Sequence, residues 1–171
     1  MLNIINNLRP FFEDCYREIN VREYAKSSGC SPPTASKRLK NYAGEKLLLQ
    51  RAEYNRLLFS ANRTSADFRD LARCYWRHRL SPLIQNMERA LTTPAAMLFG
   101  SLAKGEARRD SDVDIAIFAP AKKPLETAAL QRQFGREITI HWFNAPAGIP
   151  NEHLRNNILN GYVLTGTVRW D

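Results

Sequence analysis

Short amphipathic segments with clear end signals predict two helices near the start of the chain. Residues 21–29 form the first, and Gly29 ends it, because glycine readily adopts the left-handed conformation of a helix end. Residues 31–43 form the second, because Ser31 suits the N-cap and Pro32 suits the first helical position. Its apolar residues recur at helical spacing and form a stripe for burial: Ala35, Leu39 and Tyr42.

Two apolar runs follow the second helix and predict a β-hairpin. Residues 45–51 and 55–62 flank a short polar turn, which places Arg51 and Arg56 near the tip. Two helices joined by a tight turn and followed by a hairpin are the order of elements in a helix-turn-helix with a wing. Over about residues 10–80 the chain therefore resembles a winged helix-turn-helix domain of the small regulator type.

This resemblance implies that helix 31–43 enters the major groove of double-stranded DNA and that the hairpin reaches the flanking backbone. The hydroxyl side chains of Thr34 and Ser36 are then placed for base edges. Five basic residues would neutralise phosphates: Lys37, Arg38, Lys40, Arg51 and Arg56. The alternative is a winged helix that serves only as a scaffold for docking another protein, because a fold does not fix a function.

The distribution of charge favours DNA binding over protein docking. The chain has a formal net charge of +8, and residues 1–80 hold 15 Lys and Arg against 8 Asp and Glu. Nearly all of the positive excess therefore lies in the first half of the chain. A basic surface of this kind favours a polyanionic partner.

The second half begins with a long amphipathic segment. Residues 65–91 predict a helix that breaks into two at Pro82. We interpret 81–93 as a linker helix between two domains and as a candidate surface for a homodimer. The alternative is that its apolar stripe serves ordinary core packing, as such stripes more often do. A short apolar strand is predicted directly after it, over residues 95–100.

The motif LFGSLAKGEARRDSDVDIAIF, residues 98–118, combines strand-like flanks with two acids inside a hydrophobic run. Strand propensity disfavours Asp at positions such as Asp112 and Asp114. Alternation along the strand puts the aliphatic side chains on one buried face and both acids on the other, about 7 Å apart. Two carboxylates placed in this way are ligands for Mg2+ that carries a nucleoside triphosphate.

A glycine-serine pair precedes the acids and suits phosphate binding. Gly100 lets the backbone pass close to a phosphate, and Ser101 opens a helix whose free N–H groups attract the anion. Lys104 adds positive charge nearby. Ten residues separate this pair from the first acid. The pair, the two acids, this spacing and the hydrophobic flanks together resemble the signature of the polymerase-beta-like nucleotidyltransferases, most closely that of the minimal nucleotidyltransferases.

The resemblance covers residues 94–171 and implies roles for the residues of the motif. The nucleotide, expected to be ATP, would be bound by Gly100, Ser101 and Lys104. The catalytic residues and ligands of Mg2+ would be Asp112 and Asp114. Pyrophosphate would leave as the nucleoside monophosphate is transferred to a hydroxyl.

The family normally supplies a third carboxylate from a neighbouring strand, for which the candidate is residues 136–142. Thr139 occupies the position of that acid and provides neither an anionic ligand nor a base. Glu137 lies on the same face and reaches the site only if the register is shifted. Nucleotide binding is therefore expected, and whether the chain is an active enzyme is left open.

The sequence thus predicts an α+β chain in three parts. These are a winged helix-turn-helix over 1–80, the linker helix over 81–93 and a small mixed-sheet nucleotidyltransferase domain over 94–171. One hypothesis is an antitoxin-like autoregulator that transfers a nucleoside monophosphate to a protein or nucleic-acid hydroxyl, since family members of this size often adenylylate a cognate helical toxin. The alternative is a transcription regulator whose degenerate transferase domain senses a nucleotide or a partner. Transfer to a small molecule such as an aminoglycoside would leave the DNA-binding part without a use.

The remaining composition argues against other classes of protein. Three scattered cysteines without CxxC spacing favour free thiols in a cytoplasmic protein over a disulfide framework. Three isolated histidines give no expectation of a zinc site. We expect neither a signal peptide nor a membrane-spanning segment, because polar residues interrupt every apolar stretch.

Overall fold

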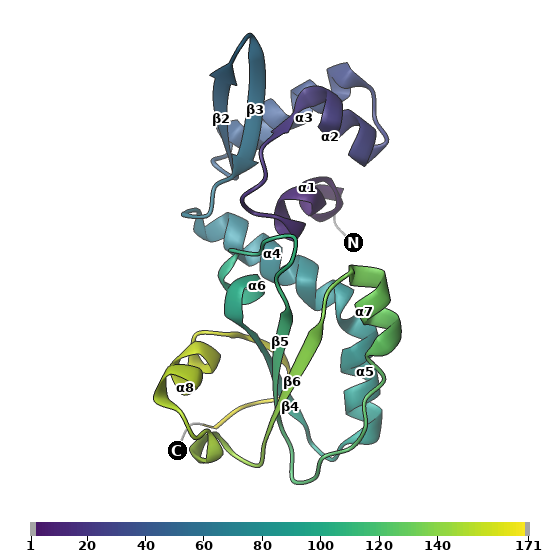
Figure 1. Cartoon of the computed structure of the whole chain (residues 1–171), viewed down its shortest axis with the longest axis vertical. Helices are drawn as coiled ribbons and strands as arrows, with labels where there is room; N and C mark the ends of the chain where they lie inside the picture. Colours follow the sequence, from purple (N-terminus) through teal and green to yellow (C-terminus); the bar gives the residue numbers. More distant parts are fainter. Residues whose placement is uncertain (1–2, 170–171) are drawn as a thin grey trace. The chain divides into compact units, whose positions relative to one another are not determined.

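The computed structural model describes residues 3–169, which fold as two compact units (Figure 1). The first unit contains the chain up to Tyr75 together with the loop 105–109, and the second contains residues 76–104 and the chain from Asp110 onward. Among the described residues, no helix is long and apolar enough to cross a membrane. Within the described residues, Cys15, Cys30 and Cys74 form no disulfide.

The first unit is built around short helices whose ends are set by local sequence. Asn20 caps α2 by accepting from the backbone N–H groups of Arg22 and Glu23, and the Glu23 carboxylate accepts from the N–H of Asn20. Gly29 ends α2 in the left-handed conformation, with φ 61°. The helices are α1 (Asn3–Glu13), α2 (Val21–Ser28), α3 (Pro32–Gly44) and the part of α4 (Ala66–Arg79) up to Tyr75. Both helices predicted for residues 21–43 are confirmed.

A three-stranded antiparallel sheet completes the first unit, in the order β1-β3-β2. Tyr54 and Asn55 form the two-residue turn of its hairpin, with φ values of 43° and 60°. Two consecutive positive φ values are what a tight hairpin turn requires, because they match the twist of the paired strands. The strands are β1 (Ile19–Asn20), β2 (Leu48–Glu53) and β3 (Arg56–Ala61), so the predicted hairpin is confirmed.

The loop 105–109 packs within the first unit although it lies inside the motif of residues 98–118. The backbone N–H of Cys15 donates to the carbonyl of Ala107 at 2.7 Å, and Ala107 is buried. Arg108 lies over the ring of Tyr16, 4.0 Å from its centroid, which is the geometry of a cation–π contact. This loop is therefore an ordered part of the first unit.

The second unit is built on a four-stranded mixed sheet in the order β6-β5-β4-β7. β4 pairs antiparallel with both β5 and β7, and β5 pairs parallel with β6. The strands are β4 (Ala95–Phe99), β5 (Val113–Phe118), β6 (Ile138–Phe143) and β7 (Tyr162–Thr165). The predicted α+β class with a small mixed sheet is confirmed for this unit.

Helices cover both faces of this sheet. In Figure 1, α8 lies on one side of the strands, and α5 and α7 lie on the other. The helices are α5 (Ser81–Ala90), α6 (Gly100–Lys104), α7 (Ala128–Phe134) and α8 (Glu152–Leu159), with a short 3-10 turn, η1 (Pro146–Gly148). The predicted break near Pro82 is present, because α4 ends at Arg79 and α5 begins at Ser81 with Pro82 in its first turn.

Residues 81–93 belong to the second unit. Within that unit, α5 buries Leu83, Ile84 and Met87, so its apolar stripe is used for packing there. The division between the two units falls at Tyr75 and Trp76, inside α4.

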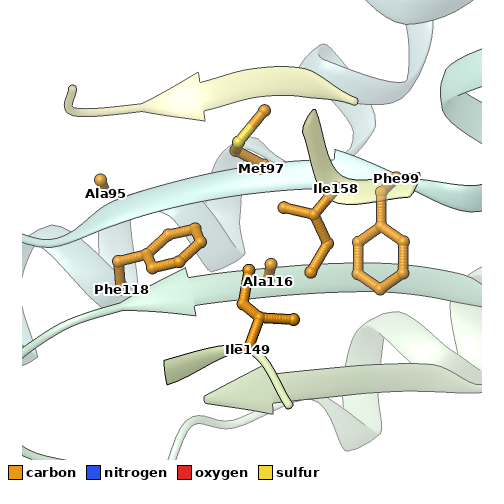
Figure 2. Packing of buried hydrophobic residues seen from close by; sticks show 7 residues of the cluster. All are labelled: Ala95, Met97, Phe99, Ala116, Phe118, Ile149 and Ile158. Atoms are coloured by element: carbon orange, nitrogen blue, oxygen red, sulfur yellow. The ribbon is translucent and has the colours of Figure 1, made fainter. Parts of the chain in front are cut away.

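One face of the sheet carries an apolar cluster beneath α8. Figure 2 shows Ile158 of α8 and Ile149 packed over side chains that β4 and β5 point toward them. The members from the strands are Ala95, Met97, Phe99, Ala116 and Phe118. Phe99 pairs with Asp114 across β4 and β5, so the same face continues from the cluster to a carboxylate.

The closing NGYVLTG segment requires its first glycine for steric reasons. A side-chain carbon on Gly161 would lie 2.6 Å from the carbonyl oxygen of Leu98 and 2.8 Å from that of Ile158. Backbone atoms at these distances cannot move aside as the end of a flexible side chain can. Gly161 therefore allows β7 to pair with β4 at the end of the strand that leads into Gly100.

Candidate functional site

Gly100 and Asp114 are the centre of the candidate site, because they pack directly against each other. Gly100 starts α6 with a φ of 73°, which favours glycine. A side-chain carbon placed on Gly100 would lie 2.4 Å from the Oδ2 atom of Asp114. The Asp114 carboxylate therefore occupies the space that the missing side chain leaves, at the point where β4 turns into α6.

The two acids differ in their surroundings. Asp114 lies within β5 and is half-buried, while the alternate residues Val113, Ile115 and Ile117 are fully buried on the opposite face. The predicted separation of aliphatic and acidic faces is confirmed for Asp114. Asp112 is exposed and stands just before β5, which begins at Val113, so it is outside the strand in which it was predicted.

The electrostatics of this pair suit a cation. Burial raises the pKa of Asp114 above its ordinary value of 3.8; the interaction with His141 lowers this pKa, and the interaction with Asp112 raises it further. A half-buried carboxylate next to a second carboxylate is stabilised by a divalent ion. Mg2+ is commonly bound by one or two carboxylates, with water and substrate phosphates completing its shell. Within residues 3–169, no three His, Cys, Asp or Glu side chains cluster as a metal site, so Asp112 and Asp114 fit only this shared type of binding.

The parallel strand β6 offers Thr139 where a third acid was expected. Asp114 pairs with Thr139 in the β5–β6 register, and both are half-buried on the same face. Glu137 is exposed and precedes the strand, and its carbonyl accepts from the N–H of Val113 at 2.8 Å. The register therefore agrees with the assignment of Thr139 and gives Glu137 no place beside Asp114.

The other two residues assigned to the nucleotide lie on α6. Ser101 is half-buried in the first turn of the helix, next to Gly100. Lys104 is exposed, and its Nζ donates to the Oδ1 atom of Asn157 on α8 at 2.9 Å. An amide partner does not neutralise the charge of Lys104, so this side chain keeps its positive charge for an anion.

The residues assigned to DNA contacts on α3 are unequally accessible. Thr34, Lys37 and Lys40 are exposed, whereas Ser36 and Arg38 are half-buried. The Nη1 atom of Arg38 donates to Asn7 at 3.3 Å, which directs its guanidinium toward α1. The exposed face of α3 is therefore carried by Thr34, Lys37 and Lys40.

On the hairpin, Arg51 and Arg56 also differ. Arg51 pairs with the carboxylates of Glu18 and Glu53, so a phosphate would have to compete with two acids for it. Arg56 is exposed and follows the turn directly. Sequence reasoning could not see the pair with Glu18, which lies 33 residues away in the chain.

Two further side chains of interest were missed by sequence reasoning. Tyr54 is 93% exposed at the hairpin turn and borders a pocket of about 580 Å³ formed by residues 20–23 and 54–57. Its signal in the sequence was an aromatic residue in a two-residue turn. His141 lies on the same face as Asp114, with its ring 5.3 Å from that of Phe99. A lone histidine without metal-ligand spacing gave no signal.

Comparison with known proteins supports the assignment of the second unit. Residues 83–164 match the family model described as Polymerase beta, Nucleotidyltransferase. This range includes Gly100, Ser101, Asp112, Asp114 and Thr139. Proteins of this family generally use divalent metal ions. No curated protein and no solved structure shows significant similarity to the chain.

The raised pKa of Asp114 predicts how the metal-free protein responds to pH. The folded protein binds the proton of this carboxyl more tightly than the unfolded chain does, so ionised Asp114 costs stability at pH 7. Asp114→Asn should therefore melt at a higher temperature than the wild type at pH 7 without metal. The difference should shrink as the pH falls through the raised pKa and vanish below 3.8, where the carboxyl is protonated in both the folded and the unfolded chain.

Thermal unfolding in a chelating buffer at several pH values measures this difference. The control is Asp110→Asn, which neutralises an exposed acid and should change the melting temperature little. Equal melting temperatures of Asp114→Asn and the wild type at pH 7 would contradict the prediction.

Proposed function

We propose that the second unit binds a nucleoside triphosphate with Mg2+ and transfers its nucleoside monophosphate to a hydroxyl of a macromolecule. The nucleotide we propose is ATP. The family match supports a nucleotidyltransferase domain, which implies a nucleotide substrate. The observation that carries the proposal is the contact of Asp114 with Gly100, because it brings a metal-binding acid to the turn that suits a phosphate.

Each residue of the site has a separate task in this proposal. The backbone at Gly100 and the hydroxyl of Ser101 bind phosphate oxygens, and Lys104 adds positive charge. Asp112 and Asp114 hold the metal, which neutralises the phosphates and acidifies the attacking hydroxyl when it is bound. The acceptor oxygen bonds to the α-phosphorus, the bond to the bridging oxygen breaks, and pyrophosphate leaves with that electron pair while the acceptor proton passes to solvent.

A second candidate function is favoured by the register of β6. Thr139 pairs with Asp114 at the position where a third carboxylate would help to activate the acceptor. A site with two acids keeps its means of binding the triphosphate but has weaker support for deprotonating the hydroxyl. In this candidate, the unit is a nucleotide or partner sensor with slow or absent transfer.

We also propose that the first unit is a winged helix-turn-helix that binds double-stranded DNA. The capped helices α2 and α3 and the hairpin with its tight turn support this proposal. So do the exposed Lys37 and Lys40 on α3 and Arg56 beside the turn. Arg51 would contribute only after releasing Glu18 and Glu53.

The whole chain, as a homodimer, would then regulate its own operon. The acceptor of the transferred nucleoside monophosphate would be a small helical toxin encoded in the same operon.

Neutralising both acids tests the metal site. Asp112→Asn combined with Asp114→Asn should abolish Mg2+-dependent binding of ATP, because the protein then offers the metal neither of its two proposed carboxylate ligands. Isothermal titration calorimetry with and without Mg2+ measures this change. The matched control is Asp67→Asn with Asp110→Asn, which removes the same charge from exposed positions and should bind as the wild type does. Unchanged binding by the first double variant would remove the proposed site.

Restoring an acid at position 139 separates the two candidate functions. The wild type should bind ATP but transfer labelled nucleotide slowly or not at all to a co-expressed partner, and Thr139→Asp should raise that transfer. The reason is that aspartate at 139 would lie beside Asp114 in the β5–β6 register. Rapid labelling by the wild type that Glu137→Ala eliminates would instead assign the third acid to Glu137.

Neutralising two lysines tests the DNA interface. Lys37→Ala with Lys40→Ala should weaken binding to duplexes of any sequence. The slope of log affinity against log salt concentration should also become shallower by about two, because each lysine that contacts a phosphate releases about one counterion. Fluorescence anisotropy over a range of salt concentrations measures both. The matched control is Lys122→Ala with Lys123→Ala, which removes the same charge from an exposed loop of the second unit. Equal affinity of the wild type and the α3 variant would contradict the proposal.

A further inference from the structure

Arg136 is the one charged residue that is buried among residues 3–169, with 8% of its surface exposed. It follows Gly135, which ends α7 in the left-handed conformation, and only Glu137 separates it from β6. A buried cation loses its hydration at a cost of several kcal/mol, so its retention requires compensating contacts. The guanidinium lies over the ring of Trp76, 5.3 Å from the centroid, which supplies one of them.

The second contact of Arg136 reaches the backbone next to the candidate metal site. Its Nη1 atom donates to the carbonyl oxygen of Ser111 at 2.5 Å. On the other side of Asp112, the N–H of Val113 donates to the carbonyl of Glu137 at 2.8 Å. The backbone on both sides of Asp112 is therefore held by Arg136 and Glu137, the two residues just before β6.

This arrangement matters because Asp112 has little support of its own. It stands before β5 begins, and its side chain is exposed. Asp114, by contrast, is held within β5 between β4 and β6. The direction in which the Asp112 carboxylate points thus depends on how its two neighbours are fixed.

We propose that Arg136 is a positioning residue of the nucleotide site, which fixes Asp112 through the carbonyl of Ser111. This inference rests on the proposed function, in which Asp112 binds the metal of a metal–nucleotide complex. Arginine suits the task better than lysine, because a planar guanidinium stacks on Trp76 and still donates in its own plane to Ser111. Arg136 itself contacts neither nucleotide nor metal in this proposal.

Arg79 provides a matched control in the same cluster. Its guanidinium lies over the ring of Phe134 at 4.7 Å, and Phe134 packs against Trp76 with ring centroids 6.1 Å apart. Arg79→Met therefore removes a cation–π contact from the same group of aromatic rings without touching Ser111. Arg136→Met removes both the contact with Trp76 and the hydrogen bond to Ser111. Arg136→Lys keeps the positive charge and a single donor nitrogen.

The measurement is the affinity for ATP with and without Mg2+, together with the melting temperature. Arg136→Met should reduce the Mg2+-dependent gain in ATP affinity about tenfold or more, which is the size expected for losing a charged hydrogen bond. Binding of ATP without Mg2+ should change little, because Gly100 and Ser101 are untouched. In Arg136→Lys, the Mg2+-dependent gain in ATP affinity should be only about threefold smaller than in the wild type. Arg79→Met should keep the full Mg2+-dependent gain even if its melting temperature falls as far as that of Arg136→Met.

The outcomes distinguish this inference from the function on which it rests. A folded Arg136→Met that keeps the full Mg2+-dependent gain overturns the inference and leaves the metal site intact. An equal loss in Arg79→Met also overturns it, because the effect would then be general destabilisation. If Arg136→Met does not fold, an unchanged gain in Arg136→Lys overturns the inference. A wild type without any Mg2+-dependent gain overturns the proposed function and this inference together.

Discussion

The antiparallel pairing of β4 with β5 is the constraint on which the candidate site depends. It sets Phe99 opposite Asp114, so that the next residue along the chain, Gly100, turns directly against the Asp114 carboxylate. A side chain at position 100 and the carboxylate cannot occupy the same space. The turn at Gly100, which we propose binds phosphate, and the acid are therefore brought together by the sheet itself. Gly161 extends this constraint, because it allows β7 to pair with the other side of β4 close to the same end.

The surroundings of Asp114 explain why a carboxylate at this position is more than a surface acid. On the face of the sheet that carries it, β4 and β5 are otherwise apolar, and Met97, Ala116 and Phe118 pack there beneath α8. Burial raises the pKa of Asp114, so the ionised side chain is retained at a cost in stability when no cation is present. Residues that reduce stability in this way are concentrated at functional sites.

The start of β6 affects the site in two opposite ways. Its register places Thr139 beside Asp114, which withholds the third acid that transfer would use. The residues just before it hold the backbone around Asp112, through the guanidinium of Arg136 and the carbonyl of Glu137. The same segment thus favours the proposed binding of a metal and nucleotide, while it weakens the case for rapid transfer. The loop 105–109, which joins α6 to the acids, folds with the first unit, so the two halves of the motif are linked by chain that packs elsewhere.

The sequence by itself determined the features that act over a few residues. Capping by Asn20, the stop at Gly29 and the two-residue turn at Tyr54 and Asn55 are local, and the predicted helices and hairpin agree with the structure. The alternation after Asp112 likewise assigned the buried face of β5, and the spacing of the motif identified the family that residues 83–164 match.

Only the tertiary structure decided what depends on distant partners. Arg51 is engaged by Glu18, Lys104 by Asn157 and Ser111 by Arg136, and each pair is separated by 25 residues or more. Packing also decided where residues 81–93 belong, because the apolar stripe of α5 is buried within the second unit. Periodicity shows that such a stripe will be buried, but not against what. Where a side chain has several partners within its reach, the choice is made by the arrangement of whole elements, which no short stretch of sequence contains.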